Sequence, residues 1–123
     1  MSGISIVSDT NPLIYLLNGN FEAADYLDGK QVWISVISEL ELFGKKGLSD
    51  IEKDEINYLL ENCFIAEINP QIKQITKNIM QEVSVKLPDA IVAATSLYLD
   101  LPLLTADIGF EKIHGLKLIL LEF

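Results

Sequence analysis

Four acidic residues stand where apolar segments of the sequence end or where a helix is expected. They are Asp9, Glu41, Asp89 and Asp107. Carboxylates that gather in one place repel one another unless protons or a metal ion compensate their charge. Their hard oxygen atoms suit Mg²⁺ or Mn²⁺. These residue types therefore predict a divalent-metal site, provided that the fold brings the four side chains together.

Each acid also has a simpler explanation when it is taken alone. Asp9 and Asp107 suit turns, Asp89 complements the dipole in the first turn of a helix, and Glu41 suits a solvated helix face. Three of the four, however, come where apolar segments end. In a parallel sheet the carboxyl ends of the strands share one edge, and ligands bind there where the strand order reverses. A common site is therefore expected at that edge.

Short runs of apolar and β-branched residues predict the strands. The expected strands are Ile4–Ser8, Gln31–Val36, Phe64–Ile68, Leu101–Thr105 and Leu116–Leu121. Capping signals and glycines predict the helices between them. Helices are expected over Pro12–Leu17 after Asn11, over Phe21–Asp28, from Ser38, after Ser49 with Glu52 as a capping box, after Asn69-Pro70, and from Leu87. The alternation predicts an α/β fold with three layers, α/β/α, and a mostly parallel five-stranded sheet.

Length and composition predict a single domain over residues 1–123, because 50% of the residues are hydrophobic and can fill one core. No apolar run reaches the ~18 residues of a membrane-spanning helix. The stretch Met1–Val7 has neither the basic start nor the length of a signal peptide, so a cytoplasmic location is expected. The single Cys63 is interpreted as a small buried hydrophobe, and the single His114 as structural or solvent-facing.

The formal net charge is −9, from eighteen acidic residues and nine basic ones, all of them lysine. This charge argues against a simple electrostatic binder of nucleic acid. It does not exclude an enzyme that acts on nucleic acid, because divalent cations seated among carboxylates invert the local field. Without arginine, lysines, backbone amides or metal ions must hold any phosphate. We expect Lys45, Lys46 and Lys86 to do so, because they lie near the acidic residues in the sequence.

Three ordered segments of the sequence form a more specific pattern. They are Ser8-Asp9-Thr10-Asn11, Ile34-Ser35-Val36-Ile37-Ser38 leading to Glu41-Leu42, and Leu87-Pro88-Asp89-Ala90-Ile91-Val92-Ala93-Ala94-Thr95 with Leu104-Thr105-Ala106-Asp107 and Phe110. With them the chain resembles a PIN-domain ribonuclease, and more narrowly a VapC-type toxin of a toxin–antitoxin pair. The resemblance covers almost the whole length.

The resemblance implies a PIN-like fold and a metal-dependent endoribonuclease with Mg²⁺ or Mn²⁺. It implies that Asp9, Glu41, Asp89 and Asp107 bind the metal, with Thr10, Asn11 and Thr105 as polar support. It also implies an RNA substrate, a cognate antitoxin and a homodimer. The helix from Ser38 offers two glutamates, Glu39 and Glu41, which a regular helix points in different directions. The Ser38-x-x-Glu41 spacing favours Glu41 as the ligand, or else as the partner in a capping box, and leaves Glu39 facing solvent.

Other classes of protein remain as alternatives. A PIN-like binding or dimerisation module would keep the fold without catalysis. An aspartate-based phosphotransfer domain also places a carboxylate after a strand, but Asn11 stands where aspartate-nucleophile phosphatases carry a second acid. A nucleotide-binding module is disfavoured because the sequence contains no glycine-rich phosphate loop.

Overall fold

The computed structural model describes residues 4–122; the ends of the predicted domain, residues 1–3 and 123, lie outside the described residues. The described chain contains one five-stranded sheet in the order β3-β2-β1-β4-β5. Its strands are β1 (Ser5–Ser8), β2 (Gln31–Ser35), β3 (Phe64–Ala66), β4 (Leu103–Thr105) and β5 (Leu118–Leu120). All four strand pairings are parallel. The predicted α/β class and parallel sheet are therefore confirmed.

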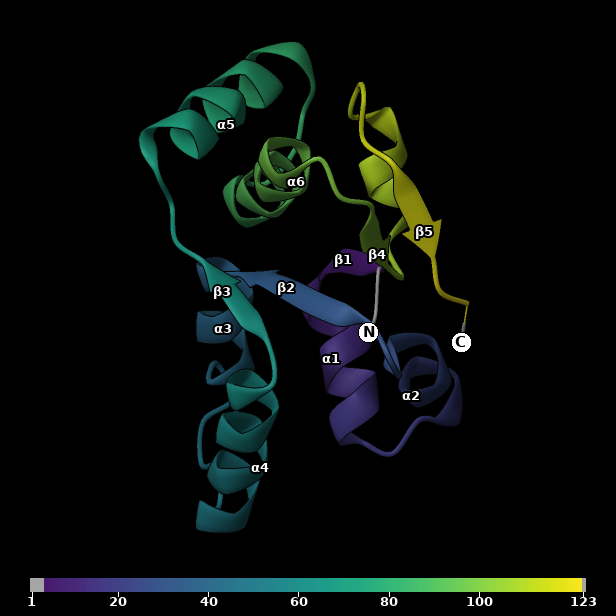
Figure 1. Cartoon of the computed structure of the whole chain (residues 1–123). Coiled ribbons are helices and arrows are strands. Elements are labelled where there is room, and N and C mark those ends of the chain that lie inside the picture. The colour runs from purple at the N-terminus through teal and green to yellow at the C-terminus, as the bar shows by residue number, and fades with distance from the viewer. Residues whose placement is uncertain (1–3, 123) are drawn as a thin grey trace.

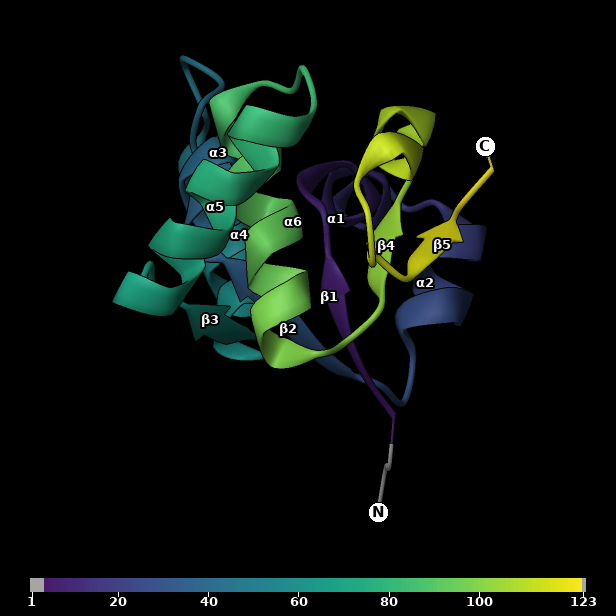
Figure 2. The same ribbon diagram turned by 90° about the horizontal axis from the view of Figure 1, so that it is seen from above.

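Helices cover both faces of this sheet (Figures 1 and 2). They are α1 (Thr10–Leu17), α2 (Phe21–Leu27), α3 (Val36–Leu42), α4 (Asp50–Glu61), α5 (Pro70–Glu82), α6 (Leu87–Leu99) and the 3-10 helix η1 (Ile108–Lys112). Figure 1 shows α5 and α6 on one side of the sheet and α1, α2 and α4 on the other. Within the described part of the chain, no helix is both long and apolar enough to cross a membrane.

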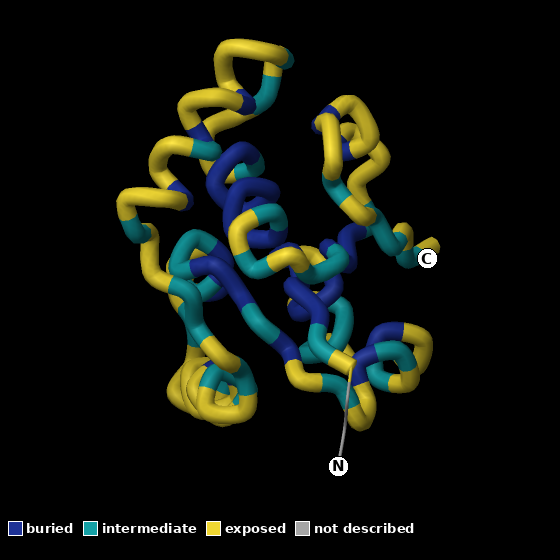
Figure 3. Tube along the Cα trace, turned by 45° about the horizontal axis from the view of Figure 1, so that its top comes forward, coloured by how far each residue is buried: buried dark blue, intermediate teal, exposed yellow. Residues whose placement is uncertain are grey.

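The alternation of side chains along the strands creates two apolar cores. Ile6 points to the core shared with α1, α2 and α4, whereas its neighbour Val7 points to the core shared with α5 and α6. The inner helix α6 is buried from Ala90 to Ser96, and it forms the dark centre of Figure 3. Its alanines let the helix approach the sheet closely, and α5 covers its outer side. The sheet is therefore the middle of three layers, as predicted.

The strand order reverses at β1, because β2 and β3 extend to one side of it and β4 and β5 to the other. The two strands next to this reversal, β1 and β4, are paired through Val7 with Leu103 and Ser8 with Leu104. In parallel sheets the crevice at such a reversal is the usual place for a ligand. Asp9 and Thr105 lie at the carboxyl ends of these two strands, which places both residues at this point.

Two predicted helix starts are wrong, and both helices begin earlier than expected. Asp9, not Asn11, is the N-cap of α1, because its carboxylate accepts a hydrogen bond from the Thr10 N–H. Ser35, not Ser38, is the N-cap of α3, and its hydroxyl accepts a bond from the Ile37 N–H. The cap is the last residue of β2 in one case and the residue directly after β1 in the other, so the chain turns from each strand straight into a helix. The capping-box role that was considered for Glu41 with Ser38 is therefore excluded.

The remaining helices and strands lie where they were predicted, but the strands are shorter than expected. The capping box of Ser49 with Glu52 is present at the start of α4, and Asn69 caps α5 through its side chain. The strands β3, β4 and β5 each have only three residues, because their flanking residues do not pair. The helix η1 was not predicted, since a five-residue 3-10 helix carries little periodic pattern.

Replacement of Leu104 by alanine tests the importance of the core beneath the strand ends. Leu104 is 0% exposed and packs in the core on the α1 side. The substitution should lower the free energy of unfolding by about 2–5 kcal/mol, because it leaves a cavity. Urea unfolding measures this loss. Ile51→Ala is the control, since Ile51 is 71% exposed on α4 and its loss should stay within about 0.5 kcal/mol. Equal losses in the two variants would contradict this description of the core.

Candidate functional site

The centre of the candidate site is Asp9, which is only 7% exposed at the end of β1. Its Oδ1 accepts a hydrogen bond of 2.9 Å from the Thr10 N–H, and its Oδ2 accepts one of 2.8 Å from the Thr105 hydroxyl. Burial raises the pKa of the Asp9 carboxyl, the two hydrogen bonds oppose this rise, and the charges of Asp89 and Glu41 add to it. Asp9 is therefore a buried carboxyl that two donors hold in place.

Thr105 joins Asp9 to the segment after β4. Its side chain is buried, and while its hydroxyl donates to Asp9 it accepts a 3.0 Å hydrogen bond from the Asp107 N–H. Asp107 is exposed and caps η1, because its Oδ1 accepts a 2.8 Å bond from the Gly109 N–H. A Cβ at position 109 would lie 3.0 Å from that oxygen, so glycine permits the close approach. The Asp107 backbone is thus linked to Asp9 through one threonine, while the exposed Asp107 carboxylate is held by the Gly109 N–H.

Thr10 joins Asp9 to helix α3. The Thr10 Oγ1 lies 2.5 Å from Glu41 Oε1 and 3.0 Å from Ser38 Oγ. Because a carboxylate can only accept, the single hydroxyl hydrogen of Thr10 goes to Glu41. Ser38 is buried one turn before Glu41, so it supports the threonine from the same helix. The structure therefore gives Ser38 a place beside the site that the capping prediction missed.

Asp89 lies in the first turn of α6, on the other side of the sheet from α1. It is half-buried, and burial is the main cause that raises its pKa. The charges of Asp107 and Glu41 raise the pKa further, whereas Lys86 and Lys112 lower it. Each of the four predicted acids therefore interacts electrostatically with at least one other. The structure brings them together from four separate parts of the chain.

The donor set fits a divalent cation. Each oxygen of Asp9 accepts one hydrogen bond and keeps a further lone pair. Repulsion among the four carboxylates is relieved when a cation binds between them, and hard oxygen donors suit Mg²⁺ or Mn²⁺. As the side chains lie, however, no group of three acidic, histidine or cysteine side chains within residues 4–122 is close enough to hold one ion. Binding at this site therefore requires the exposed carboxylates to move towards Asp9.

The other predicted residues lie in different environments. Asn11 is exposed on α1, and Lys46 is exposed after α3. Lys45 Nζ lies 3.6 Å from Glu52 Oε2, so this lysine is directed to α4. Glu39 is half-buried rather than solvent-facing. Of the predicted lysines, only Lys86 lines a cavity together with Asp89.

The two residues with reactive side chains outside the acidic cluster have no part in it. His114 is exposed after η1, which agrees with the prediction. Cys63 is half-buried after α4, where burial raises the pKa of its thiol. Neither residue lines the cavity beside the acids.

A cavity of about 440 Å³ opens beside Asp89 and Asp107, between the start of α6 and η1. Its walls carry Lys86 and also Lys112, a residue that the sequence analysis did not select. Little in the sequence indicated that Lys112 lies near the acids, because η1 was not expected and this position belongs to no motif. The structure alone brings this lysine to the acids.

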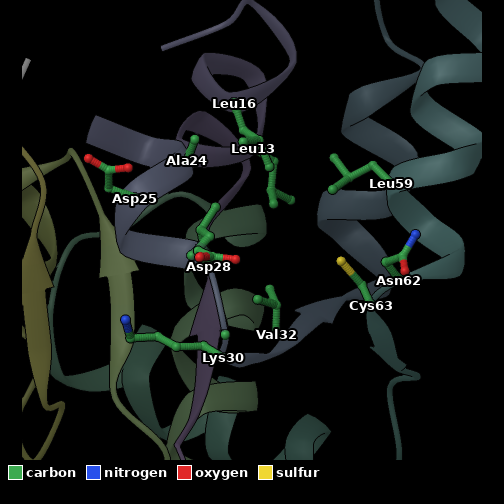
Figure 4. Close-up of a pocket in the computed structure, with 12 residues that line it drawn as sticks. Leu13, Leu16, Ala24, Asp25, Asp28, Lys30, Val32, Leu59, Asn62 and Cys63 are labelled. Atoms are coloured by element: carbon green, nitrogen blue, oxygen red, sulfur yellow. The ribbon is translucent and has the colours of Figure 1, made fainter. Parts of the chain in front are cut away.

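A separate groove lies on the α1 side of the sheet, away from the acidic cluster. One part, of about 560 Å³, lies between α1, α2, β2 and α4, and Figure 4 shows Leu13 and Leu16 facing Leu59 across it. A second part, of about 700 Å³, shares Leu16 and Leu59 with the first and extends along α4 past Tyr58. None of the four acids lines either part. We call this the α1–α4 groove.

A family model described as PIN domain matches residues 6–116 of the sequence. The chain belongs to the PIN-domain family. The match spans Asp9, Glu41, Asp89 and Asp107, and it confirms the family that the sequence pattern predicted. A search of curated proteins finds no match to this PIN domain.

Solved structures share the fold of this PIN domain over nearly its whole length. A toxin–antitoxin complex from Klebsiella pneumoniae is 31% identical, covers 93% of this chain and 95% of its own, and has a TM-score of 0.80. VapBC2 from Rickettsia felis, bound to a promoter DNA fragment, is 16% identical, covers 97% and 100%, and has a TM-score of 0.84. DNA-bound VapBC from Salmonella typhimurium is 19% identical, covers 94% and 97%, and also has a TM-score of 0.84. The predicted resemblance to VapC-type PIN domains is confirmed.

The buried Asp9 carboxyl predicts a pH-dependent cost in stability. Because its pKa is raised in the folded protein, the folded state holds this proton to a higher pH than the unfolded chain does. Stability should therefore fall as the pH rises from the usual Asp value near 4 through the raised value. In EDTA, Asp9→Asn should lose less stability than the wild type between pH 4 and pH 7, as measured by urea unfolding.

Asp54→Asn is the matched control for this measurement, because Asp54 is exposed on α4. It should keep the wild-type dependence on pH. The free energy of unfolding of Asp9→Asn could instead change with pH as steeply as that of the wild type and of Asp54→Asn. That result would show that Asp9 is not a destabilising buried acid.

Proposed function

We propose that this PIN domain is a divalent-metal-dependent endoribonuclease and the toxin of a toxin–antitoxin pair. The observation that carries the proposal is the convergence of Asp9, Glu41, Asp89 and Asp107 at the reversal of strand order. Family membership supports a nuclease, and the toxin–antitoxin complexes among similar structures support the toxin role. An enzyme that cleaves cellular RNA acts in the cytoplasm, which is the location that we propose.

In this mechanism the four acids would hold Mg²⁺ or Mn²⁺ beside the substrate phosphate. The metal, when bound, lowers the pKa of a water ligand and stabilises charge on the phosphoryl oxygens. Asp9 is the fixed ligand, since both of its oxygens are already held. Thr105 and Thr10 orient Asp9 and Glu41, as donors behind metal ligands generally do. No serine, cysteine or histidine nucleophile is needed.

The alternative is a PIN-like binding or dimerisation module without catalysis. Such a module has no need for a buried carboxyl beside three other acids, which repel one another and lower stability. Two threonines link Asp9 to Glu41 and to the backbone of Asp107, which supports a functional cluster of acids. We therefore favour the nuclease over the binding module. An aspartate-based phosphotransfer domain is less favoured, because Asn11 stands where aspartate-nucleophile phosphatases carry a second acid.

We also propose an antitoxin as partner, bound in the α1–α4 groove. The groove has leucine walls, and among the described residues its rim carries Asp25, Asp28, Asp54 and Glu55 against a single basic residue, Lys30. Tyr58, at the open part of the groove, is 71% exposed. Apolar walls with an acidic rim suit an amphipathic segment with basic residues. Homodimer formation, implied by the resemblance, stays a prediction.

Asp9→Asn should nearly abolish metal-dependent cleavage. The substitution keeps the shape of the side chain and removes its charge, and the loss should exceed the ~100-fold at the upper end for residues behind metal ligands. Cleavage of an unstructured RNA in Mg²⁺ or Mn²⁺ measures this activity, and EDTA should remove it from the wild type. Asp54→Asn should retain wild-type cleavage. Full activity of Asp9→Asn would falsify the mechanism.

Thermal unfolding gives a test of the metal site without RNA. A metal that binds only the folded state raises the melting temperature. Millimolar Mn²⁺ should raise the Tm of the wild type and of Asp54→Asn, but it should raise the Tm of Asp9→Asn much less. An unchanged wild-type Tm at this concentration would count against the site.

The two glutamates of α3 provide a matched pair on one helix. Glu41→Gln should reduce cleavage and weaken the Mn²⁺ effect on Tm, because Glu41 accepts the Thr10 hydroxyl and interacts with both Asp9 and Asp89. Glu39→Gln removes the same charge two residues away and should leave both quantities near wild type. The reverse result would show that Glu39 is the ligand.

A further inference from the structure

The lysines of this PIN domain differ in whether another protein group holds their ammonium group. Lys45 and Lys117 pair with Glu52 and Asp100 on the surface, and Lys30 bonds to the Tyr26 carbonyl and covers its ring. Lys86 and Lys112 differ, because both line one cavity beside two of the four acids. Neither takes part in an ion pair within residues 4–122. Two cationic side chains from separate elements therefore meet at the cavity without a fixed anionic partner.

The cavity has the size and the lining for part of an RNA strand. Its volume of about 440 Å³ falls in the range of small-molecule sites and suits a single nucleotide. Asp89 and Asp107 form the wall towards the metal site, and the buried Phe110 provides an apolar surface. Both lysines also lower the pKa of Asp89, which agrees with their proximity. The cavity therefore shares Asp89 and Asp107 with the proposed metal site.

We propose that this cavity binds the RNA phosphate next to the one that is cleaved, and that Lys112 and Lys86 hold that phosphate. The inference rests on the proposed ribonuclease function and adds the substrate contacts. At the proposed site the charge of the metal would compensate the carboxylates next to the scissile phosphate. The neighbouring phosphate has no such compensation and would face Asp89 and Asp107 in a chain with a net charge of −9. Lysines at this cavity supply the missing positive charge.

A different role for the same lysines would be to neutralise Asp89 alone. That role requires no contact with RNA, so the two explanations differ in the salt dependence of substrate capture. Each phosphate contact adds a little under one unit to the slope of log affinity against log salt, about 0.7 for a single strand. A lysine that only faces Asp89 contributes nothing to this slope.

The test uses Lys112→Met and Lys86→Met, which remove the charge and keep the length of the side chain. Lys117→Met is the control, because it changes the net charge equally but lies outside the cavity and pairs with Asp100 at 3.2 Å. The measured quantity is kcat/KM for a short single-stranded RNA at several salt concentrations, with saturating Mg²⁺. Each cavity variant should flatten the slope by about 0.7 and the double variant by about 1.4.

For Lys112→Met the loss should appear in KM, with kcat near that of the wild type, because Lys112 contacts a phosphate that does not react. The Mn²⁺ effect on Tm should persist in this variant, which shows that the protein is folded and binds metal. Slopes equal to that of Lys117→Met would overturn the inference while wild-type cleavage leaves the ribonuclease proposal standing. A wild type without metal-dependent cleavage would instead overturn the proposed function and this inference with it.

Discussion

The structure depends on the burial of one carboxyl at the reversal of strand order. Asp9 directly follows β1, caps α1 and accepts a hydrogen bond from the Thr105 hydroxyl of the neighbouring strand β4. A buried carboxylate is costly unless donors satisfy it, and here a backbone N–H and a hydroxyl do so. The remaining repulsion from nearby acids is left uncompensated by protein groups. The proposed metal ion would relieve this repulsion, so the fold would gain stability when the ion binds.

Much of the fold could be predicted because the strands and helices alternate clearly in the sequence. The short apolar runs around Val7 and Leu104 have the composition of buried strands, and their shared direction places Asp9 and Thr105 at one edge. The helix starts were less predictable. Asp9 and Asn11 are both good caps, as are Ser35 and Ser38, and Pro12 favoured the wrong choice. Sequence spacing does not show where the preceding strand ends, and the cap is the last residue of that strand or the one directly after it.

The acids of the candidate site could be predicted by type, whereas the contacts around them could not. Thr10 reaches Glu41 only because α3 starts directly after β2 and turns Glu41 towards α1. Lys45 appeared suitable from its position in the sequence, yet it pairs with Glu52. The position of Lys112 beside the acids could not be predicted, because this residue ends a short 3-10 helix that has no periodic pattern. Long-range contacts of flexible side chains depend on details of packing that periodicity does not report.

Helix α1 has one end in the acidic cluster and its side in the α1–α4 groove. Thr10, its first residue, hydrogen-bonds to Glu41, and Leu13 and Leu16 form a wall of the groove (Figure 4). With eight residues, α1 is a rod of about 12 Å, too short to bend appreciably along its length. A molecule that shifts α1 from the groove therefore also shifts Thr10 relative to Glu41. A displacement of α1 at the groove would therefore be transmitted to the acidic cluster, although no residue of the cluster lines the groove.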